Sequence, residues 1–242
     1  MDKSNNELEF VESLYNEADE QLKEVYKIQK TNRDELLKEI GNILLIYTIA
    51  DGVMNMSKQE RDKEHIKLFK IIKTFRNSSV KKQEEVITNI LNNTVKGIYD
   101  FYSYNYKLKD VKKIIDNNFK GKHFSKRVWN NETTVAKRLH MQCQEFLKGK
   151  VSVNQIKKDI EKTFNTSAYN AKRLTETEVS RCQNESFKKF CNETDVKKLK
   201  YNATLCNSCP NCMDDDGKIF DINNAPDLPK HPCCHCYYEI EE

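Results

Sequence analysis

Proline is missing from the first 209 residues of this 242-residue chain, and all four prolines fall in the last 37 residues. The same 37 residues hold six of the nine cysteines, and the whole chain has only six glycines. Because proline breaks helices and glycine weakens them, a stretch poor in both favours long helices and argues against an all-β fold. The sequence therefore predicts a mainly α-helical protein whose C-terminal segment is built differently.

Apolar residues recur every three or four positions along most of residues 5–200. This spacing places them on one face of a helix. Gly52 is expected to end the first helix. Ser57, with Glu60 three residues later, has the pattern of a capping box at the start of the second helix.

Further interruptions of the pattern divide the helical part into segments. Clusters of Asn, Ser and Gly predict joints at residues 77–79 and 117–125, and a stop at Gly149 with a cap at Ser152. The elements that we expect beyond residue 125 are helices over 126–148, 153–164 and 165–194 and strands over 196–205 and 218–222.

Residues 99–107 form an aromatic stretch, YDFYSYNYK. Such rings could stack on the bases of a single-stranded nucleic acid. More often they pack a helix end against its neighbour, and we favour this interpretation.

The charged residues are unevenly distributed along the chain. Residues 101–150 have twelve lysines and arginines against four acids, whereas residues 213–242 have eight acids against two lysines. A basic region suits contact with nucleic acid or an acidic partner, and it is also typical of a solvated helix face. The residues that could face DNA, without sequence preference, are Lys112, Lys113, Lys120, Lys122, Lys126 and Arg127.

Nothing in the sequence indicates export or membrane insertion. The first ten residues are polar and acidic, unlike a secretory signal. The longest apolar run, residues 43–50, is too short to cross a bilayer. We therefore expect folding in a reducing cytoplasm, where clustered cysteines hold metal more often than they form disulfides.

The C-terminal cysteines have the spacing of a zinc site. Zn²⁺ takes four sulfur or nitrogen ligands, here from two short turns joined by a loop. A CxxC turn is followed, eighteen residues later, by the sequence HPCCHC. We expect the ligands to be Cys209, Cys212, His231 and Cys234, with Cys236, Cys233, His235 and Cys206 as alternatives.

Three interpretations of this cysteine cluster differ in chemistry. A structural zinc ion that folds a segment with too few apolar residues is the one we favour. Disulfides in an oxidised particle, and a catalytic metal with an open coordination position, are the alternatives. Asp216 and Gly217 are interpreted as a tight turn into the following strand.

Four blocks of the chain, in this order, carry a resemblance: SKRVWNNETTVAKRL, SAYNAKRLTETEVSRCQNESFKKF, CPNCMDDDGKIFD and HPCCHC. They resemble the phage minor head proteins of the Mu F-like head morphogenesis family over about residues 120–242. Where that family commonly has arginine, this sequence has Glu176, Asn207 and His235, and Leu205 stands where the family commonly has an acid. The positions that match the family motif are Thr177, Glu178, Arg181, Cys209, Cys212, Asp216, Gly217, His231, Pro232, Cys234 and Cys236.

With the helical pattern, the resemblance implies a mainly α fold in two regions. Residues 1–119 would form an elongated helical arm, and residues 120–242 a helical Mu F-like domain ending in a small α+β zinc knuckle at 205–242. Glu178 and Arg181 lie three residues apart on a helix, where an ordinary ion pair is expected rather than a catalytic role.

The resemblance also implies a function. It points to a minor capsid protein, not an enzyme, that binds the portal protein and other capsid proteins inside the virion after assembly in the host cytoplasm. Such a protein would assist head assembly and the packaging or ejection of double-stranded DNA. The alternative is a metal-dependent nuclease or toxin-like effector built on a Mu F-like domain.

Overall fold

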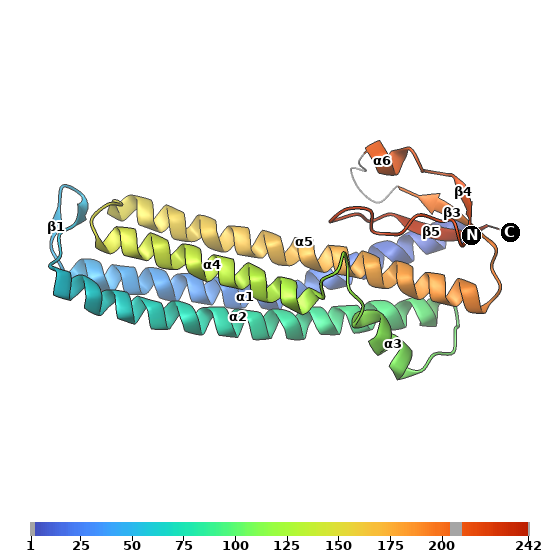
Figure 1. Cartoon of the computed structure of the whole chain (residues 1–242), viewed down its shortest axis with the longest axis horizontal. Coiled ribbons are helices and arrows are strands. Elements are labelled where there is room, and N and C mark those ends of the chain that lie inside the picture. The colour runs from blue at the N-terminus through green and yellow to red at the C-terminus, as the bar shows by residue number, and fades with distance from the viewer. Residues whose placement is uncertain (1–2, 204–209, 242) are drawn as a thin grey trace. The chain divides into compact units, whose positions relative to one another are not determined.

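The computed structural model describes residues 3–203 and 210–241. It confirms a mainly α-helical chain with a small α+β segment at the C-terminus (Figure 1). The helices are α1 (Lys3–Ile46), α2 (Lys58–Phe101), α3 (Leu108–Ile115), α4 (Phe124–Leu147), α5 (Val153–Glu193) and α6 (Pro210–Met213). The strands are β1 (Ile49–Ala50), β2 (Val53–Met54), β3 (Lys198–Asn202), β4 (Ile219–Asp221) and β5 (Tyr237–Glu241).

The chain forms two compact units that are each assembled from separate segments. Unit 1 contains residues 1–22, 85–124 and 172–242, and unit 2 contains residues 23–84 and 125–171. Helices α1, α2 and α5 contribute residues to both units. The boundary at residue 119 that the family resemblance implies stays a prediction.

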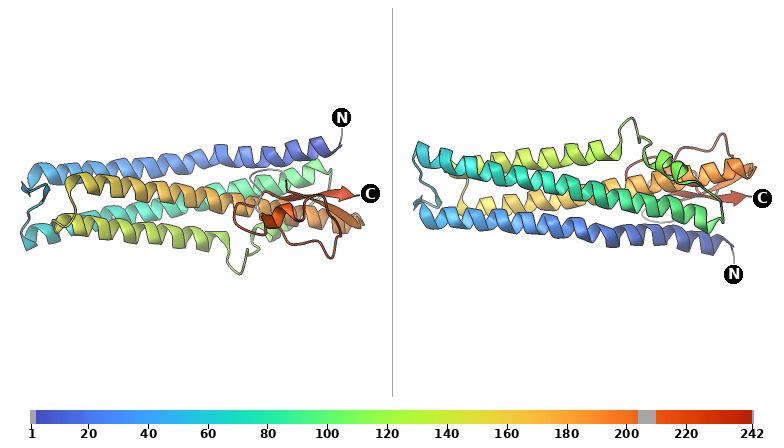
Figure 2. Two further views of the ribbon diagram at one scale, coloured as in Figure 1. Left: turned by 90° about the horizontal axis from the view of Figure 1, so that it is seen from above. Right: turned by 90° about the horizontal axis from the view of Figure 1, so that it is seen from below.

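Unit 2 consists of four helical segments, from α1, α2, α4 and α5, that lie side by side (Figures 1 and 2). Helices α2 and α4 run antiparallel, because Phe69 stacks on His140 while Gln83 contacts Glu132. Buried apolar side chains from all four segments form one core, including Leu36, Ile40, Leu68, Ile72, Val135, Leu139, Ile156 and Ile160.

Unit 1 contains the first part of α1, the end of α2, helix α3 and the second half of α5, together with the C-terminal segment. Its three-stranded antiparallel sheet has the order β4-β3-β5. The central strand β3 buries Leu199 and Tyr201 completely. The alternation predicted over residues 196–205 is therefore a real strand, shorter than the predicted range.

Several predicted helix ends are confirmed by their hydrogen bonds. The Ser57 amide donates to Glu60 Oε2 at 2.7 Å, and the Glu60 amide donates to Ser57 Oγ at 3.3 Å, which is a capping box. Ser152 Oγ accepts from the Gln155 amide at 3.2 Å. Gly149 has a φ of +71°, and a Cβ there would lie 2.5 Å from the carbonyl oxygen of Met54, so this turn requires glycine.

The break at Gly52 is confirmed, but the surrounding residues form a β-hairpin. Strands β1 and β2 pair in register across Asp51 and Gly52, whose φ angles are 50° and 77°. Two consecutive residues with positive φ are typical of a two-residue hairpin turn, and Asp-Gly is a favoured sequence for it.

Two predicted joints were wrong, because α2 and α5 each continue through them. At residues 77–79, Ser78 Oγ donates to the carbonyl of Phe75, and buried Ser79 accepts from Asn32 Nδ2 at 3.1 Å. At residue 165, Thr166 Oγ1 likewise donates to the carbonyl of Lys162. These hydroxyls bond to their own helix or to a neighbouring one, so the polar residues do not end the helix.

The aromatic stretch at 99–107 packs inside unit 1, as favoured above. Tyr99 is fully buried, and the Tyr102 ring stacks on Phe190 with centroids 4.7 Å apart. Phe101 stacks on Phe10 at 4.2 Å. Within the described residues, no helix is long and apolar enough to cross a membrane.

A buried polar cluster lies between the helices of unit 2. Glu132 on α4 is only 4% exposed, and its Oε1 accepts from Gln83 Nε2 at 2.7 Å and from Ser167 Oγ at 2.8 Å. Ser167 in turn accepts from Gln29 Nε2 at 2.9 Å. Helices α1, α2, α4 and α5 are thus joined by one chain of hydrogen bonds, which favours a single register of the four helices.

Replacing Glu132 with glutamine is expected to stabilise the protein at pH 7 by about 1 kcal/mol, because the amide oxygen keeps both hydrogen bonds without a buried charge. Burial raises the pKa of Glu132, although the bonds from Gln83 and Ser167 act in the opposite direction. The native state therefore binds the proton more tightly than the unfolded state, so this residue makes stability fall as pH rises above about 4.3.

Thermal melts of the wild type and E132Q between pH 4 and pH 8 measure this effect. The gain from the substitution should grow with pH until it is constant. The matched control is Glu35→Gln on the exposed face of α1, which should change neither the midpoint nor its pH dependence. An E132Q protein that is less stable than wild type at pH 8 would contradict the prediction.

Candidate metal centre

The C-terminal sheet places the predicted ligands at one end of strand β3. Helix α6, which contains Cys212, follows β3 after a short connection, and β5 begins immediately after Cys236. Because β5 pairs with β3 from Asn202 opposite Tyr237, the residues that precede β5 return to the end of β3 near α6. Two segments about twenty residues apart in the sequence are thereby brought together.

Three of the four predicted ligands meet at this point. The ligand atoms of Cys212, His231 and Cys234 all lie within 4.8 Å of one another. His231 Nε2 is 3.3 Å from Cys212 Sγ, and the two sulfurs are 3.9 Å apart. Cys212 and Cys234 are buried, whereas His231 is partly exposed. These three side chains could hold a metal ion.

The electrostatics of the cluster favour a thiolate. The Cys236 thiol donates a hydrogen bond to Cys234 and, together with backbone groups and His231, lowers the pKa of Cys234 below its ordinary value. The interaction with Cys234 and burial raise the pKa of Cys236. A lowered pKa suits Cys234 to metal binding, because the thiolate is the form that binds metal.

The neighbours of the cluster orient its ligands. His231 Nδ1 lies 3.0 Å from the carbonyl oxygen of Pro232, which leaves Nε2 directed at Cys212. Lys230 donates to the carbonyl of Asn211 at 3.2 Å and pairs with Asp215, so it ties the α6 turn to the second turn. Its ammonium also lies 4.4 Å from the centre of the buried Tyr201 ring. The sequence analysis did not identify this role of Lys230, although its position directly before the predicted ligand His231 could have indicated it.

The alternative ligands Cys233 and His235 have other contacts. Cys233 has a φ of 57°, its amide donates to Thr177 Oγ1 at 3.1 Å, and its thiol faces the carbonyl of Arg173. The His235 ring stacks on Tyr15 with centroids 3.9 Å apart. Cys236 remains beside the cluster through its contacts with Cys234 and Cys212. The predicted ligand Cys209 and the alternative Cys206 lie outside the described residues.

Asp216 and Gly217 form the tight turn that the sequence predicts. Gly217 has a φ of +73°, and its amide donates to the carbonyl of Tyr201 at 2.8 Å. Asp216 Oδ1 accepts from the Ala203 amide at 2.8 Å. The turn therefore fixes the end of β3 next to the cysteine cluster, and the aspartate bonds to backbone.

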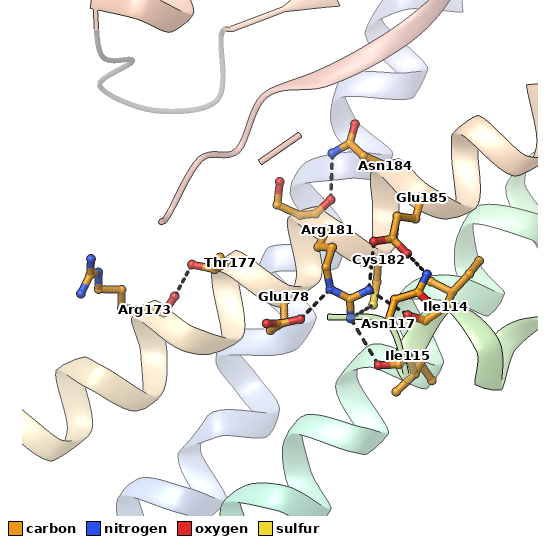
Figure 3. A network of polar contacts seen from close by, with 11 residues as sticks. Ile114, Ile115, Asn117, Arg173, Thr177, Glu178, Arg181, Cys182, Asn184 and Glu185 are labelled. Carbon is orange, nitrogen blue, oxygen red and sulfur yellow. Dashed lines mark hydrogen bonds and ion pairs between the residues drawn. The ribbon is translucent and has the colours of Figure 1, made fainter. Parts of the chain in front are cut away.

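Thr177, Glu178 and Arg181, the residues of α5 singled out by the resemblance, make contacts that hold segments of unit 1 together (Figure 3). Thr177 Oγ1 donates to the carbonyl of Arg173 at 2.7 Å and accepts from the Cys233 amide, which connects α5 to the second cysteine turn. Arg181 Nε donates to Glu178 Oε2 at 2.7 Å, and both side chains are buried, at 3% and 0% exposure. The ion pair expected from the sequence is therefore present, and it is a buried one.

Arg181 also holds the end of another helix. Its Nη1 donates to the carbonyl of Ile114 at 2.7 Å and to Glu185 Oε1 at 3.2 Å, and Nη2 donates to the carbonyl of Ile115 at 3.4 Å (Figure 3). Ile114 and Ile115 are the last residues of α3, and the Ile114 carbonyl also accepts from the Asn117 amide at 3.2 Å. The guanidinium bonds to both carbonyls and thereby connects α3 to α5.

Two of the positions that depart from the family pattern, Glu176 and His235, lie next to each other, whereas Leu205 and Asn207 lie outside the described residues. His235 Nε2 is 3.8 Å from Glu176 Oε2. Burial acts to raise the pKa of Glu176, but hydrogen bonds with the side chains of His235 and Cys233 lower it below its ordinary value. Glu176 and His235 thus form a polar contact beside the second cysteine turn.

The six basic residues predicted to face DNA belong to different parts of the fold. Lys112 and Lys113 lie on α3, and Lys120 and Lys122 lie in the following turn, where Lys120 Nζ donates to the carbonyl of Lys230 at 3.4 Å. These four belong to unit 1, whereas Lys126 and Arg127 begin α4 in unit 2. Their role in DNA binding stays a prediction.

No family model matches this chain, and no curated protein or solved structure gives a significant match.

Proposed function

We propose that this protein is a portal-associated minor capsid protein of a tailed phage or prophage, and that a zinc ion folds its C-terminal segment. The observation that carries the proposal is the convergence of the motif residues. Thr177, Cys212, His231 and Cys234 come from three separate segments, and the hydrogen bonds and short distances above bring them together in unit 1. This is the arrangement expected if the last three blocks of the resemblance form one folded unit, whereas the first block, residues 125–139, lies in unit 2.

The ligand chemistry supports zinc. Thiolate and imidazole groups are good ligands for Zn²⁺, whereas Mg²⁺ and Ca²⁺ prefer oxygen ligands such as carboxylates. Cys236, beside Cys212 and Cys234, is suited to supply the fourth ligand, and Cys209 is the other candidate. A site closed by four protein ligands leaves no open position for a reacting water, so its role is structural.

The polar groups around the site support the same role. Lys230, Asp215 and Asp216 bond to one another or to backbone carbonyl and amide groups, so they fix the turns. Metal binding would contribute the stabilisation that a small three-stranded sheet lacks, since such a segment has little apolar area of its own. The long helices of both units offer extended surfaces for docking to portal and capsid proteins.

Co-expression with the portal protein of the same phage or prophage tests the functional part. We expect the two proteins to co-purify through affinity and size-exclusion steps at moderate salt, and the chain to be present in mature particles. Absence from purified particles, with no portal complex at low salt, would contradict the proposal. Plasmid nicking that depends on an added metal and is lost on His231→Ala would instead support the nuclease alternative.

A further inference from the structure

The face shared by α2 and α4 in unit 2 is basic and nearly free of acids. Residues 65–83 of α2 have six lysines and arginines and no acid. Residues 125–144 of α4 have four lysines and arginines and one acid, Glu132, which is buried. These stretches lie side by side (Figure 2), as the contact of Arg76 with Trp129 also indicates.

The other two helices of unit 2 have no such bias. Residues 23–46 of α1 have five basic and four acidic residues, and residues 153–171 of α5 have three basic and two acidic residues. The full unit 2 segments of α2 (58–84) and α4 (125–147) have nine basic against four acidic residues and four basic against two acidic residues, and the acids of α2 lie at the ends of its segment. The central stretch of α2 and the neighbouring stretch of α4 therefore carry the basic excess that suits an anionic partner.

We define the α2–α4 basic face as Lys70, Lys73 and Arg76 of α2 with Lys126 and Lys137 of α4, together with Trp129. The α2 residues are spaced by three positions and the two α4 lysines by eleven, which is about three helical turns, so the residues of each helix share one side of it. In the described part of the chain none of the five cations has an acidic partner, in contrast to Lys67, which pairs with Glu39 on α1.

Two of these cations lie over the ring of Trp129. Its side chain is 41% exposed, the Arg76 guanidinium lies 4.9 Å from its ring centre, and the Lys126 ammonium lies 4.4 Å from it. The indole ring attracts each cation, although the cations repel one another. An anion bound between them would remove this repulsion. Because two cations already engage the ring, it is poorly suited to stack on an unpaired base.

We propose that the α2–α4 basic face binds the phosphate backbone of double-stranded DNA without reading its sequence. Duplex DNA has one negative charge per about 1.7 Å of its axis, and twenty helical residues extend about 30 Å, so several phosphates face the five cations at once. The binding extends the proposed function, and it rests on that function only for the identity of the DNA as the packaged genome.

The chain provides its own probe for this interaction. Trp129 is its only tryptophan, so its fluorescence reports on the proposed surface. We would titrate the full-length protein with a 30-base-pair duplex of arbitrary sequence and follow both tryptophan emission and the anisotropy of labelled DNA. We expect Kd between about 10⁻⁴ and 10⁻⁶ M at physiological salt, tighter binding at lower salt, and a changed Trp129 emission.

The variant Lys73→Gln/Arg76→Gln/Lys126→Gln should weaken binding at least about tenfold and lower the slope of log K against log salt by about 2 to 3. The matched control is Lys157→Gln/Lys158→Gln/Lys162→Gln on α5 of the same unit, which should change the affinity less than about threefold. A second comparison, Lys112→Gln/Lys113→Gln/Lys120→Gln, tests the basic residues of unit 1. Unchanged thermal melts establish that each variant is folded.

Several outcomes would overturn the inference. These are equal loss of affinity in the α5 control, unchanged affinity in the α2–α4 variant, or DNA binding that leaves Trp129 emission unaffected. Equal affinity for poly-glutamate would identify an acidic protein as the partner instead. A protein that co-purifies with the portal but does not bind DNA would contradict this inference alone, whereas DNA binding without portal association would contradict only the proposed function.

Discussion

Replacing Cys212 with serine is expected to release the metal ion and unfold the C-terminal segment, whereas replacing Cys233 is expected to do neither. Cys212 Sγ lies 3.3 Å from His231 Nε2 and 3.9 Å from Cys234 Sγ, while the Cys233 thiol faces the carbonyl of Arg173. Structural zinc sites contribute on the order of 10 kcal/mol of apparent binding free energy, which is enough to determine whether a small segment folds.

Elemental analysis of protein purified in reductant without chelator measures whether the metal ion is lost. We expect about one zinc ion per chain in the wild type and in Cys233→Ser, and a substantial loss in Cys212→Ser and Cys234→Ser. Limited proteolysis measures the second part, because residues 196–242 should become sensitive only where the metal is lost. Adding a zinc chelator to the wild type should reproduce the Cys212→Ser pattern.

Two further variants identify the fourth ligand. With Co²⁺ in place of Zn²⁺, the sulfur-to-metal absorption band should weaken when a ligating cysteine is removed. Comparison of Cys236→Ser with Cys209→Ser then shows which sulfur completes the site. A wild type without bound metal, or equal metal loss in Cys233→Ser and Cys212→Ser, would contradict the arrangement of ligands described above.

Replacing Arg181 with methionine is expected to destabilise unit 1 by about 3–5 kcal/mol. The substitution leaves Glu178, which is 0% exposed, without its cationic partner in an environment where water cannot replace it. It also removes the donors to the terminal carbonyls of α3 at Ile114 and Ile115. Lysine is not expected to restore full stability, because a single ammonium cannot reproduce the planar arrangement of guanidinium donors.

Chemical denaturation and amide hydrogen exchange measure these effects. Exchange should increase most for the amides of α3, which lose their connection to α5. The double variant Glu178→Gln/Arg181→Met should be less destabilised than the sum of its single variants, because no buried charge is left uncompensated. The matched control is Arg33→Ala, which removes an arginine from a partly exposed ion pair with Asp34 and should cost less than about 1 kcal/mol. An equal loss of unfolding free energy in Arg181→Met and Arg33→Ala would contradict the structural role of Arg181.

The sequence predicted which types of residue form the candidate site, but it predicted less completely which individual residues come together there. A zinc site of this kind needs two turns that contain cysteines at a suitable spacing, and that spacing can be recognised in the sequence alone. Five candidates crowded the second turn, and spacing cannot distinguish them. The backbone at Cys233, with its positive φ, turns that side chain toward α5, while β5 pairing places Cys234 and Cys236 near α6.

The helical class and several helix ends were also predictable, since capping residues act through local hydrogen bonds. The Ser57–Glu60 box and the Gly149 turn depend on residues within a few positions of one another. The joints predicted at 77–79 and 165 were wrong because residues distant in the sequence stabilise the helix at these positions. Asn32 on α1 and Glu132 on α4 supply partners for Ser79 and Ser167, so these polar residues are stable inside continuous helices.

The sequence by itself determined the helical class, several helix ends and the types of candidate metal ligand, because periodicity, capping and ligand chemistry depend on near neighbours. Only the tertiary structure decided which cysteines meet, that Arg181 holds the end of α3, and that α2 and α4 share a basic face that includes Trp129. Each of these depends on residues more than twenty positions apart, whose proximity is determined by the packing of whole helices and strands.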